Sequence, residues 1–451
     1  MTTGARLNRS PAATVATPFR TPDADSSETM TRRAWWLIVL NVLIPGSAQI
    51  LAGNRRLGRF GAASTLALWG LVIVAVVIWL VSRSLVFDLV TNSAALTVLQ
   101  VVFAAYAVLW VVLTFDTLRL ARLVRAVPAA RPTMAILSIV ALVFTAGAAS
   151  YGAATAGSAR AALNSIFGGT SMAAPVDGRY NILLLGGDAG SDRTGLRPDS
   201  TSLASIDAVT GATTIIGIPR NMQKIQFAKD SPLWGPFPQG YSCGDLCLID
   251  YLYTYADEHR SLYPDAVKQG SSAGIEAMKD AVEGVTGLKI QYYALIDMQG
   301  FADLIDSLGG ITIDVPERTP WGGVTGAKPQ GYFEAGTQHM SGTQALWYSR
   351  SRYDGNDFQR MARQRQVQES MLKQFQPATV LTRFQDVAKA GTQVVNTDIP
   401  AAALGGLVDL AGKSRTQSVK KLEIVPPTFD PAHPNYKKIF AAVAAATAPR
   451  P

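Results

Sequence analysis

The sequence has 451 residues, of which 48% are hydrophobic and 16% charged, and its net charge is +8. This length exceeds that of one ordinary domain, and the composition is more apolar than that of most soluble proteins. The charge is uneven: residues 1–133 contain 13 Arg and 5 acidic residues, a balance of +8, whereas residues 134–451 contain 28 basic and 28 acidic residues. Because the excess positive charge flanks apolar segments, it indicates a membrane region and gives no support for nucleic-acid binding.

Four stretches without a charged residue lie in the first third of the chain, at 34–54, 60–82, 89–115 and 132–159. Each is long enough to cross a bilayer, which needs about 20 apolar residues. The first has arginines on both sides and contains Pro45 and Gly46, so we interpret it as a re-entrant or interfacial segment. The other three are predicted to span, which makes residues 32–154 the transmembrane region.

Basic loops predict the orientation of these spans. The loop between the second and third spans contains four arginines, and such loops remain in the cytoplasm. The tail formed by residues 1–31 is rich in Thr, Ser, Pro and Ala and is predicted to be disordered and cytoplasmic. We therefore expect a multi-pass protein of the cell membrane whose chain after Tyr151 lies on the outer side. A fourth full span would reverse this orientation.

After residue 154 the pattern changes to that of a folded domain. Residues 155–178 are small and polar and are predicted to form a stalk. Short apolar runs, typical of strands, alternate with segments of helical spacing. The predicted strands are 181–185, 201–206, 213–218, 292–296, 311–315 and 345–352, and the predicted helices are 273–285, 301–308 and 358–375. This alternation predicts an α/β/α sandwich with a central mixed sheet over residues 179–376, followed by a C-terminal extension over 377–451.

The two cysteines, Cys243 and Cys247, are four residues apart. Zinc would need further ligands, and the three histidines are scattered along the chain. Outside the cytoplasm a short-range disulfide is the expected state of such a pair, and two free thiols are the alternative.

Two aspartates are placed where strands of the predicted sheet begin and end. Asp188 follows the strand 181–185 through two glycines, and Asp199 lies just before the strand 201–206. Ligands bind at the carboxyl ends of strands in open α/β sheets. The two carboxylates could hold one hard cation, Mg²⁺ or, alternatively, Mn²⁺. The other interpretation is that both only cap loops and turns.

Five arginines and one glutamine lie at the ends of predicted elements: Arg220, Arg350, Arg352, Arg360, Arg363 and Gln364. Arg350 and Arg352 are two residues apart on the predicted strand 345–352, which places them on one face. The last three share one side of the predicted helix 358–375. The planar guanidinium group matches phosphate oxygens, so these residues predict a phosphate site if they converge. Each by itself could be a solvated surface charge.

The ordered set of motifs resembles the LytR–CpsA–Psr family of cell-wall glycopolymer transferases. The matching blocks are NILLLGGD (181–188), RPDS (197–200), IPR (218–220), YYALID (292–297), DSLGGITIDVP (306–316), GTQAL (342–346), RSR (350–352) and DFQRMARQ (357–364). Asn221 departs from the aspartate usual after the IPR arginine, and segment 226–248 looks like an insertion. Several membrane spans are also unusual for the family.

The resemblance implies a membrane-anchored phosphotransferase. Such an enzyme moves a glycopolymer, with its phosphate, from a polyprenyl-(pyro)phosphate carrier onto peptidoglycan. It implies that Asp188 and Asp199 hold the metal and that Arg220, Arg350 and Arg352 complete the catalytic set. It further implies that Arg360, Arg363 and Gln364 help these three arginines to bind the phosphates of the substrate. The alternatives are a polyprenyl diphosphate pyrophosphatase that uses the same site, and a non-catalytic lipid-binding membrane regulator.

Overall fold

The computed structural model describes residues 19–20, 22–23, 25–81, 85–86, 89–90, 92–166, 173–188, 197–322, 328–353, 355–374 and 395–449. The chain divides into two compact units. One comprises residues 1–81 and 97–157, and the other comprises residues 82–96 and 158–451. Each unit is considered by itself.

Three helical segments of the first third are long and apolar enough to cross a membrane: Arg55–Val81, Ser93–Arg125 and Pro128–Ala161. They correspond to helix α3 (Arg55–Val81), to α5 (Ser93–Ala121) with the short helix η1 (Leu123–Arg125), and to η2 (Pro128–Ala130) with the first part of α6 (Arg131–Ile166). These are the three spans that the sequence predicts.

The segment interpreted as re-entrant or interfacial consists of two helices, α1 (Ser27–Leu43) and α2 (Ser47–Ala52). Between them Gly46 has a φ of +95°, and a Cβ there would lie 2.3 Å from the carbonyl oxygen of Gly58. The buried side chain of Gln49 donates to the carbonyl of Leu113 at 2.9 Å and to Thr117 Oγ1 at 3.0 Å. The break therefore folds α2 back against α3 and α5.

Two predicted boundaries in this region are wrong. Helix α1 begins at Ser27, inside the predicted tail, because the Ser26 side chain accepts the Thr29 N–H and caps the first turn. Residues 1–18 of that tail lie outside the described residues. Helix α6 continues to Ile166, so the first part of the predicted stalk is helical. That part of the stalk is rich in alanine, the strongest helix former.

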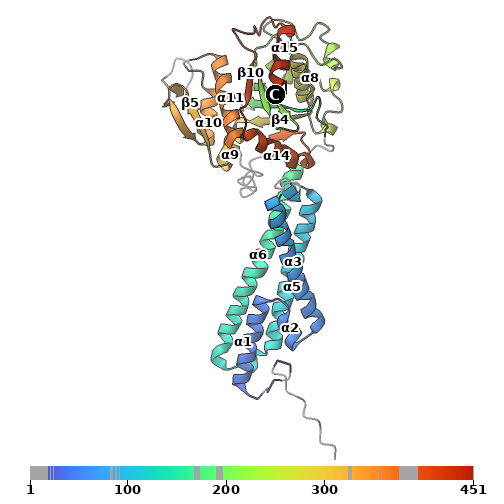
Figure 1. Ribbon diagram of the computed structural model, residues 1–451, viewed down its shortest axis with the longest axis vertical. Coiled ribbons are helices and arrows are strands. Elements are labelled where there is room, and N and C mark those ends of the chain that lie inside the picture. Colours follow the sequence, from blue (N-terminus) through green and yellow to red (C-terminus); the bar gives the residue numbers. More distant parts are fainter. Residues whose placement is uncertain are drawn as a thin grey trace, which may run out of the picture. The chain divides into compact units, whose positions relative to one another are not determined.

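The second unit is built on a six-stranded mixed sheet, as predicted (Figure 1). Its strand order is β10–β3–β2–β1–β4–β9. Strand β1 pairs antiparallel with β2 and parallel with β4, β3 pairs antiparallel with β2 and parallel with β10, and β9 pairs antiparallel with β4. The strand bounds are Arg179–Asp188 (β1), Arg197–Asp207 (β2), Thr213–Ile218 (β3), Tyr292–Asp297 (β4), Val395–Thr397 (β9) and Lys420–Glu423 (β10).

Helices cover both faces of this sheet. Helices α7 (Ile249–Glu258), α8 (Ala273–Thr286) and α15 (Tyr436–Thr447) enclose the main core with Leu183 and Leu203. On the other face, α14 (Leu404–Arg415) packs through Leu410 against Tyr180 and Ile182, and α11 (Asp357–Gln374) bonds to β2 through Gln364. The α/β/α sandwich predicted from the sequence is confirmed.

A second, smaller core lies beside the sandwich. It is formed by α9 (Met298–Ser307), α10 (Gly342–Arg350), α11 and the antiparallel pairs β5 (Ile311–Val315) with β8 (Gly336–Met340) and β6 (Thr319–Trp321) with β7 (Gly331–Phe333). Ile311, Ile313 and Val315 alternate inward from β5 and are buried. The predicted strand 311–315 therefore exists, but it belongs to this small sheet and not to the central one.

The predicted strand 345–352 is wrong, because these residues form the helix α10 and the loop that follows it. Ser341 caps this helix: its side chain accepts the Gln344 N–H, and the Gln344 side chain accepts the Ser341 N–H. This reciprocal arrangement is a capping box, and its pattern S-x-x-Q can be read in the sequence.

The insertion 226–248 folds as a loop against the main core. It contains the short helix η3 (Pro232–Trp234) and a disulfide between Cys243 and Cys247, whose Cα atoms are 5.1 Å apart. Phe227 packs edge-on against Trp234, and the Ala228 N–H donates to the Asp280 carbonyl of α8 at 2.7 Å. The loop is thus anchored directly on α8.

The segment after residue 394 completes the domain, because it supplies the two edge strands β9 and β10 and the helices α14 and α15. Lys279 of α8 pairs with Asp398 at 2.6 Å and with Glu276 at 3.0 Å. Asp398 also accepts the Tyr293 N–H of β4 at 2.7 Å. The predicted extension is therefore part of the central sheet.

The contact between the insertion and α8 predicts the effect of one glycine substitution. A Cβ at Gly284 of α8 would lie 2.1 Å from the Gln226 carbonyl oxygen, whereas one at Gly412 of α14 would meet no atom within 4 Å. We expect Gly284→Ala to lower the free energy of unfolding by about 1–3 kcal/mol through overpacking. Gly412→Ala, the matched control, should be neutral or stabilising by up to about 1 kcal/mol. Thermal unfolding of the full chain in detergent, followed by near-UV circular dichroism, measures both. Equal unfolding temperatures for the two variants would contradict the anchoring of the insertion on α8.

Candidate phosphate-binding site

Asp199 and Arg220 form the centre of the candidate site. Asp199 lies in β2, two residues after that strand begins, and Arg220 follows the end of the neighbouring strand β3. Arg220 Nη1 donates to Asp199 Oδ1 at 2.7 Å. Both side chains are about a quarter exposed, so the pair is accessible to a ligand and only partly screened by water.

Asp357, the first residue of α11, joins three arginines. Its carboxylate accepts two hydrogen bonds from Arg360, at 3.1 and 3.0 Å. Asp357 Oδ1 also lies 3.5 Å from Arg220 Nε and 3.7 Å from Arg352 Nε. One carboxylate thus holds guanidinium groups from three separate segments of the chain. The sequence indicates no role for Asp357 beyond its place at the start of the motif 357–364.

The three site residues that the sequence predicts on α11 face two different neighbours. Arg360, which is buried, donates to the backbone carbonyl of Asp199 at 2.9 Å, and Ser200 Oγ donates to the Gln364 side chain at 3.0 Å. Arg363 instead donates to the carbonyl of Ser351, in the loop after α10. Since the Arg360 guanidinium is already committed to Asp357 and Asp199, it positions these groups more than it offers free donors.

Arg350 and Arg352 are close in the chain but differ in their surroundings. Arg350 ends α10, is exposed, and lies with its Cζ 5.8 Å from the centre of the Trp347 ring. Arg352 lies in the following loop and faces Asp357, with 42% of its side chain exposed. The common face expected from a strand does not exist, because α10 is a helix that ends at Arg350.

The electrostatic surroundings shift the pKa values of two arginines of this cluster in opposite directions. Burial lowers the pKa of Arg220, but its hydrogen bond to Asp199 and the charge of Asp357 raise it above the usual value. Burial and the neighbouring Arg360 and Arg220 lower the pKa of Arg352. The charge on Arg352 is therefore not fully balanced by the protein, and an anion beside it would be stabilised.

A third carboxyl group, that of Asp250, interacts electrostatically with Arg220. Asp250 of α7 is buried, its N–H donates to the Arg220 carbonyl at 3.3 Å, and its charge contributes to the raised pKa of Arg220. With Asp250, three carboxyl groups lie among the guanidinium groups of Arg220, Arg352 and Arg360, while Arg363 interacts with Glu317. The sequence offered no signal for Asp250, which is 30 residues from Arg220.

The predicted metal pair stays a prediction. The backbone of Asp188 ends β1 and pairs with Arg197, two residues from Asp199, so both aspartates belong to the same end of the β1–β2 ladder. The side chain of Asp188 lies outside what the structure describes. Among the described residues, no group of three His, Cys, Asp or Glu side chains could hold a metal. Asp199 uses one oxygen for Arg220. Its second carboxylate oxygen is the kind of ligand that a hard cation prefers, so the residue fits a magnesium site.

A buried ion pair holds α11 against the sheet next to this site. Arg365 is 1% exposed, and its Nε lies 3.1 Å from Glu423 Oε1 of β10. A Cβ at Gly217 of β3 would lie 2.0 Å from Glu423 Oε2 and 3.0 Å from Arg365 Nε, so only glycine leaves room for the pair. Gln368 adds a bond from α11 to Ser202 at 3.2 Å.

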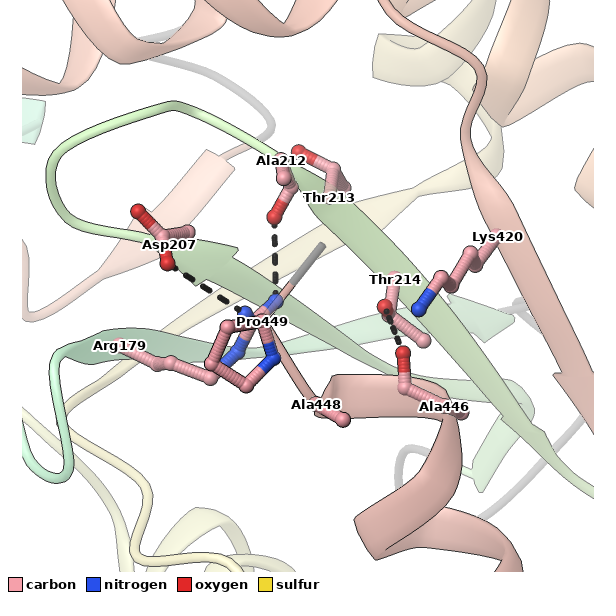
Figure 2. A pocket seen from close by; sticks show the side chains of 9 residues that line it. All are labelled: Arg179, Asp207, Ala212, Thr213, Thr214, Lys420, Ala446, Ala448 and Pro449. Atoms are coloured by element: carbon pink, nitrogen blue, oxygen red, sulfur yellow. Dashed lines mark hydrogen bonds and ion pairs between the residues drawn. The ribbon is translucent and has the colours of Figure 1, made fainter. Parts of the chain in front are cut away.

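Two cavities lie at the other end of the central sheet. Figure 2 shows the smaller cavity, of about 10 Å³. Arg179 forms an ion pair with Asp207 there and donates a hydrogen bond to the Ala212 carbonyl. Thr214 donates to the Ala446 carbonyl. This cavity has room for one water at most, so it serves to join α15 to the sheet. The larger, about 160 Å³, lies between the sheet and α14 and is lined mainly by apolar and aromatic side chains, among them Tyr180 and Leu407.

Comparison with known proteins gives a consistent family. The chain is 25% identical over 221 residues to the polyisoprenyl-teichoic acid–peptidoglycan teichoic acid transferase TagU of Bacillus cereus, over 49% of this chain and 60% of that protein. It is 25% identical over 205 residues to the corresponding transferase TagV of Bacillus subtilis, over 45% of each chain. The crystal structure of B. subtilis TagV superposes with a TM-score of 0.43 at 21% identity, covering 60% of this chain and 98% of that one.

The chain thus spans only about 45–60% of the length of these two relatives. The profile of the LytR_cpsA_psr family, in contrast, matches residues 148–428, which is more than half of the chain and includes the whole arginine and carboxylate cluster. The chain therefore belongs to the LytR_cpsA_psr family.

Proposed function

We propose that this protein is a membrane-anchored phosphotransferase that moves a glycopolymer, with its phosphate, from a polyprenyl-(pyro)phosphate carrier onto peptidoglycan. The observation that carries the proposal is the convergence of Arg220, Arg352 and Arg360 on the carboxylate of Asp357. Arg220 is more than 130 residues from Arg352 and Arg360, and the three build one cationic site. The chain's relatives are named as polyisoprenyl-teichoic acid–peptidoglycan teichoic acid transferases.

The arginines account for the part of the substrate that carries charge. Phosphoryl transfer depends mainly on positioning and on stabilising charge on the phosphate oxygens. Arg220 and Arg352 are partly exposed and would bind these oxygens, with the exposed Arg350 adding a further cation. Arg360, Arg363 and Gln364 would keep α11 and the loop after α10 in place around the bound phosphates.

The apolar part of the substrate has a candidate path along the face of the sheet that α11 and α14 cover. The cavity of about 160 Å³ lies on this face, at the opposite end of β1 from Asp199. A polyprenyl chain whose phosphates lie at the arginines would extend toward Tyr180 and Leu407. Burial of apolar surface there would contribute about 25 cal/mol per Å².

Asp188 and Asp199 would hold one Mg²⁺, or Mn²⁺, at the end of the β1–β2 ladder. When bound, the cation would neutralise charge on the phosphates as the bond to the carrier breaks. Arg220 would keep the Asp199 carboxylate oriented through their hydrogen bond. The hydroxyl oxygen of a peptidoglycan sugar would bond to the phosphorus that carries the glycopolymer as the bond from that phosphorus to the carrier breaks. The polyprenyl phosphate would leave and take up the hydroxyl proton.

The basic loop before α6 supports an orientation for the membrane region. We infer a cytoplasmic N-terminus and an extracytoplasmic domain, because the loop 119–131 between the second and third apolar helices contains four arginines. A domain outside the cytoplasm also agrees with the disulfide between Cys243 and Cys247.

The phosphate site predicts the behaviour of arginine variants. Arg220→Ala and Arg352→Ala should each weaken the binding of polyprenyl diphosphate to the full chain by roughly tenfold or more, because a lost charge-assisted contact costs about 1.5–3 kcal/mol. Arg260→Ala, at an exposed arginine of the short helix η4 (Arg260–Leu262), is the matched control and should bind normally. Unchanged affinity in both site variants would remove the phosphates from this cluster.

The metal role predicts a different pattern for the two aspartates. Asp188→Asn and Asp199→Asn preserve side-chain size but remove charge, so transfer should fall sharply while lipid binding falls less. The exposed Asp265→Asn, which loses a surface pair with Lys268, is the control and should remain active. Transfer is measured with Mg²⁺ and with chelator. Transfer that is unaffected by chelator and by both site variants would refute the metal role. Tight lipid binding without transfer under any condition would instead favour a carrier-binding regulator.

The orientation can be tested by reporter fusions. A reporter that is active only outside the cytoplasm should give signal when fused after residue 178 and remain silent when fused after residue 125. Signal from the second fusion and silence from a well-expressed first fusion would overturn the three-span arrangement.

A further inference from the structure

Two tryptophans lie at the edge of the smaller core. Trp347 is on α10 and Trp321 ends β6, and their ring centres are 6.3 Å apart at an angle of 42°. Both rings pack against the core but keep part of their surface exposed, whereas the neighbouring Tyr348 is fully buried. Aromatic surface left in water forfeits the free energy of burial, and it is typical of recognition sites.

This aromatic surface is joined to the phosphate site by one short segment. Trp347 is three residues before Arg350, whose Cζ lies 5.8 Å from the ring centre. Ser351 follows Arg350 in the chain. Its Oγ donates to the Pro320 carbonyl of β6 at 2.6 Å, and its carbonyl accepts from Arg363. Arg352 then faces Asp357. The Cα atoms of Trp347 and Arg352 are therefore at most about 18 Å apart.

The combination selects a particular kind of ligand. A lipid tail would gain from the rings but would have to lie beside the exposed charge of Arg350, which needs a polar partner. A phosphate alone would use the arginines and leave the rings in water. A sugar ring has an apolar face of C–H groups that stacks on indole and a rim of hydroxyls that accept from a guanidinium group.

We propose that Trp347 and Trp321, with Arg350, form a subsite that binds the sugar next to the phosphates of the lipid-linked glycopolymer. The proposal rests on the function proposed above and deepens it, because it assigns the recognition of the polymer's first sugar to two tryptophans outside the phosphate cluster. Arg350, at the edge of that cluster, has several N–H donors and can contact both the phosphates and the sugar. Trp347 contacts the sugar face, Trp321 supports and extends this surface, and Arg350 bonds to the hydroxyls.

The test compares two probes on the full chain in detergent: polyprenyl diphosphate, and the same lipid carrying one N-acetylhexosamine. We expect the unmodified chain to bind the sugar-bearing lipid more tightly. Trp347→Ala should weaken binding of the sugar-bearing lipid by about tenfold and of the bare lipid by less than about twofold. Trp347→Phe should lose less, because it retains an aromatic face. Trp234→Phe, in the insertion on the main core, is the matched control and should bind both probes normally.

The outcomes separate this proposal from the proposed function. If the bare lipid binds in a manner that depends on Arg352, but the sugar adds no affinity in the unmodified chain, the sugar subsite is refuted and the phosphate site stands. If the bare lipid does not bind at all, the proposed function itself fails. An equal loss of both probes in Trp347→Ala, Trp347→Phe and Trp321→Ala would show that the two rings only pack the core, and would also overturn the subsite.

Discussion

One carboxylate, that of Asp357, allows several like charges to share a small volume. Arg220, Arg352 and Arg360 would repel one another without it, and each approaches it within 3.7 Å. The compensation is incomplete, because burial and the neighbouring guanidinium groups still lower the pKa of Arg352. An anion such as a phosphate bound beside Arg352 would offset this cost of burial and repulsion.

The position of α11 therefore decides the geometry of the site, since Asp357 opens this helix. Its attachment to the sheet is polar: Gln364 and Gln368 bond to β2, and the buried Arg365 pairs with Glu423 of β10. Breaking a buried pair from one side leaves an uncompensated charge and typically costs about 3–5 kcal/mol. Strand β10 comes from the segment after residue 394, so the C-terminal part of the chain supports the position of α11.

The candidate ligand-binding residues come from both cores. The central sandwich presents Asp199 and Arg220 at neighbouring strand ends, whereas the smaller core presents Trp347, Arg350 and Arg352 from α10 and its following loop. Ser351 donates to the Pro320 carbonyl of β6 and accepts from Arg363 of α11. These two hydrogen bonds fix the loop after α10 between the smaller core and α11. A substrate with a charged centre and a sugar beside it would contact both, so its binding would also stabilise their mutual position.

Several features followed from the sequence alone, because their signals are local. The apolar spans, the strands 181–185 and 213–218 and the helix 358–375 show periodicities that depend only on neighbouring residues. The strand predicted at 345–352 is wrong because a short apolar run is ambiguous between strand and helix, and the capping pattern of Ser341 and Gln344 favours the helix. The convergence of Arg220 with Asp357, and the place of Asp250, were decided only by the tertiary structure. The distances between these residues depend on strand register and on how α7 and α11 pack against the sheet. Asp250 is 30 positions and Asp357 is 137 positions from Arg220, so no local sequence pattern could predict these contacts.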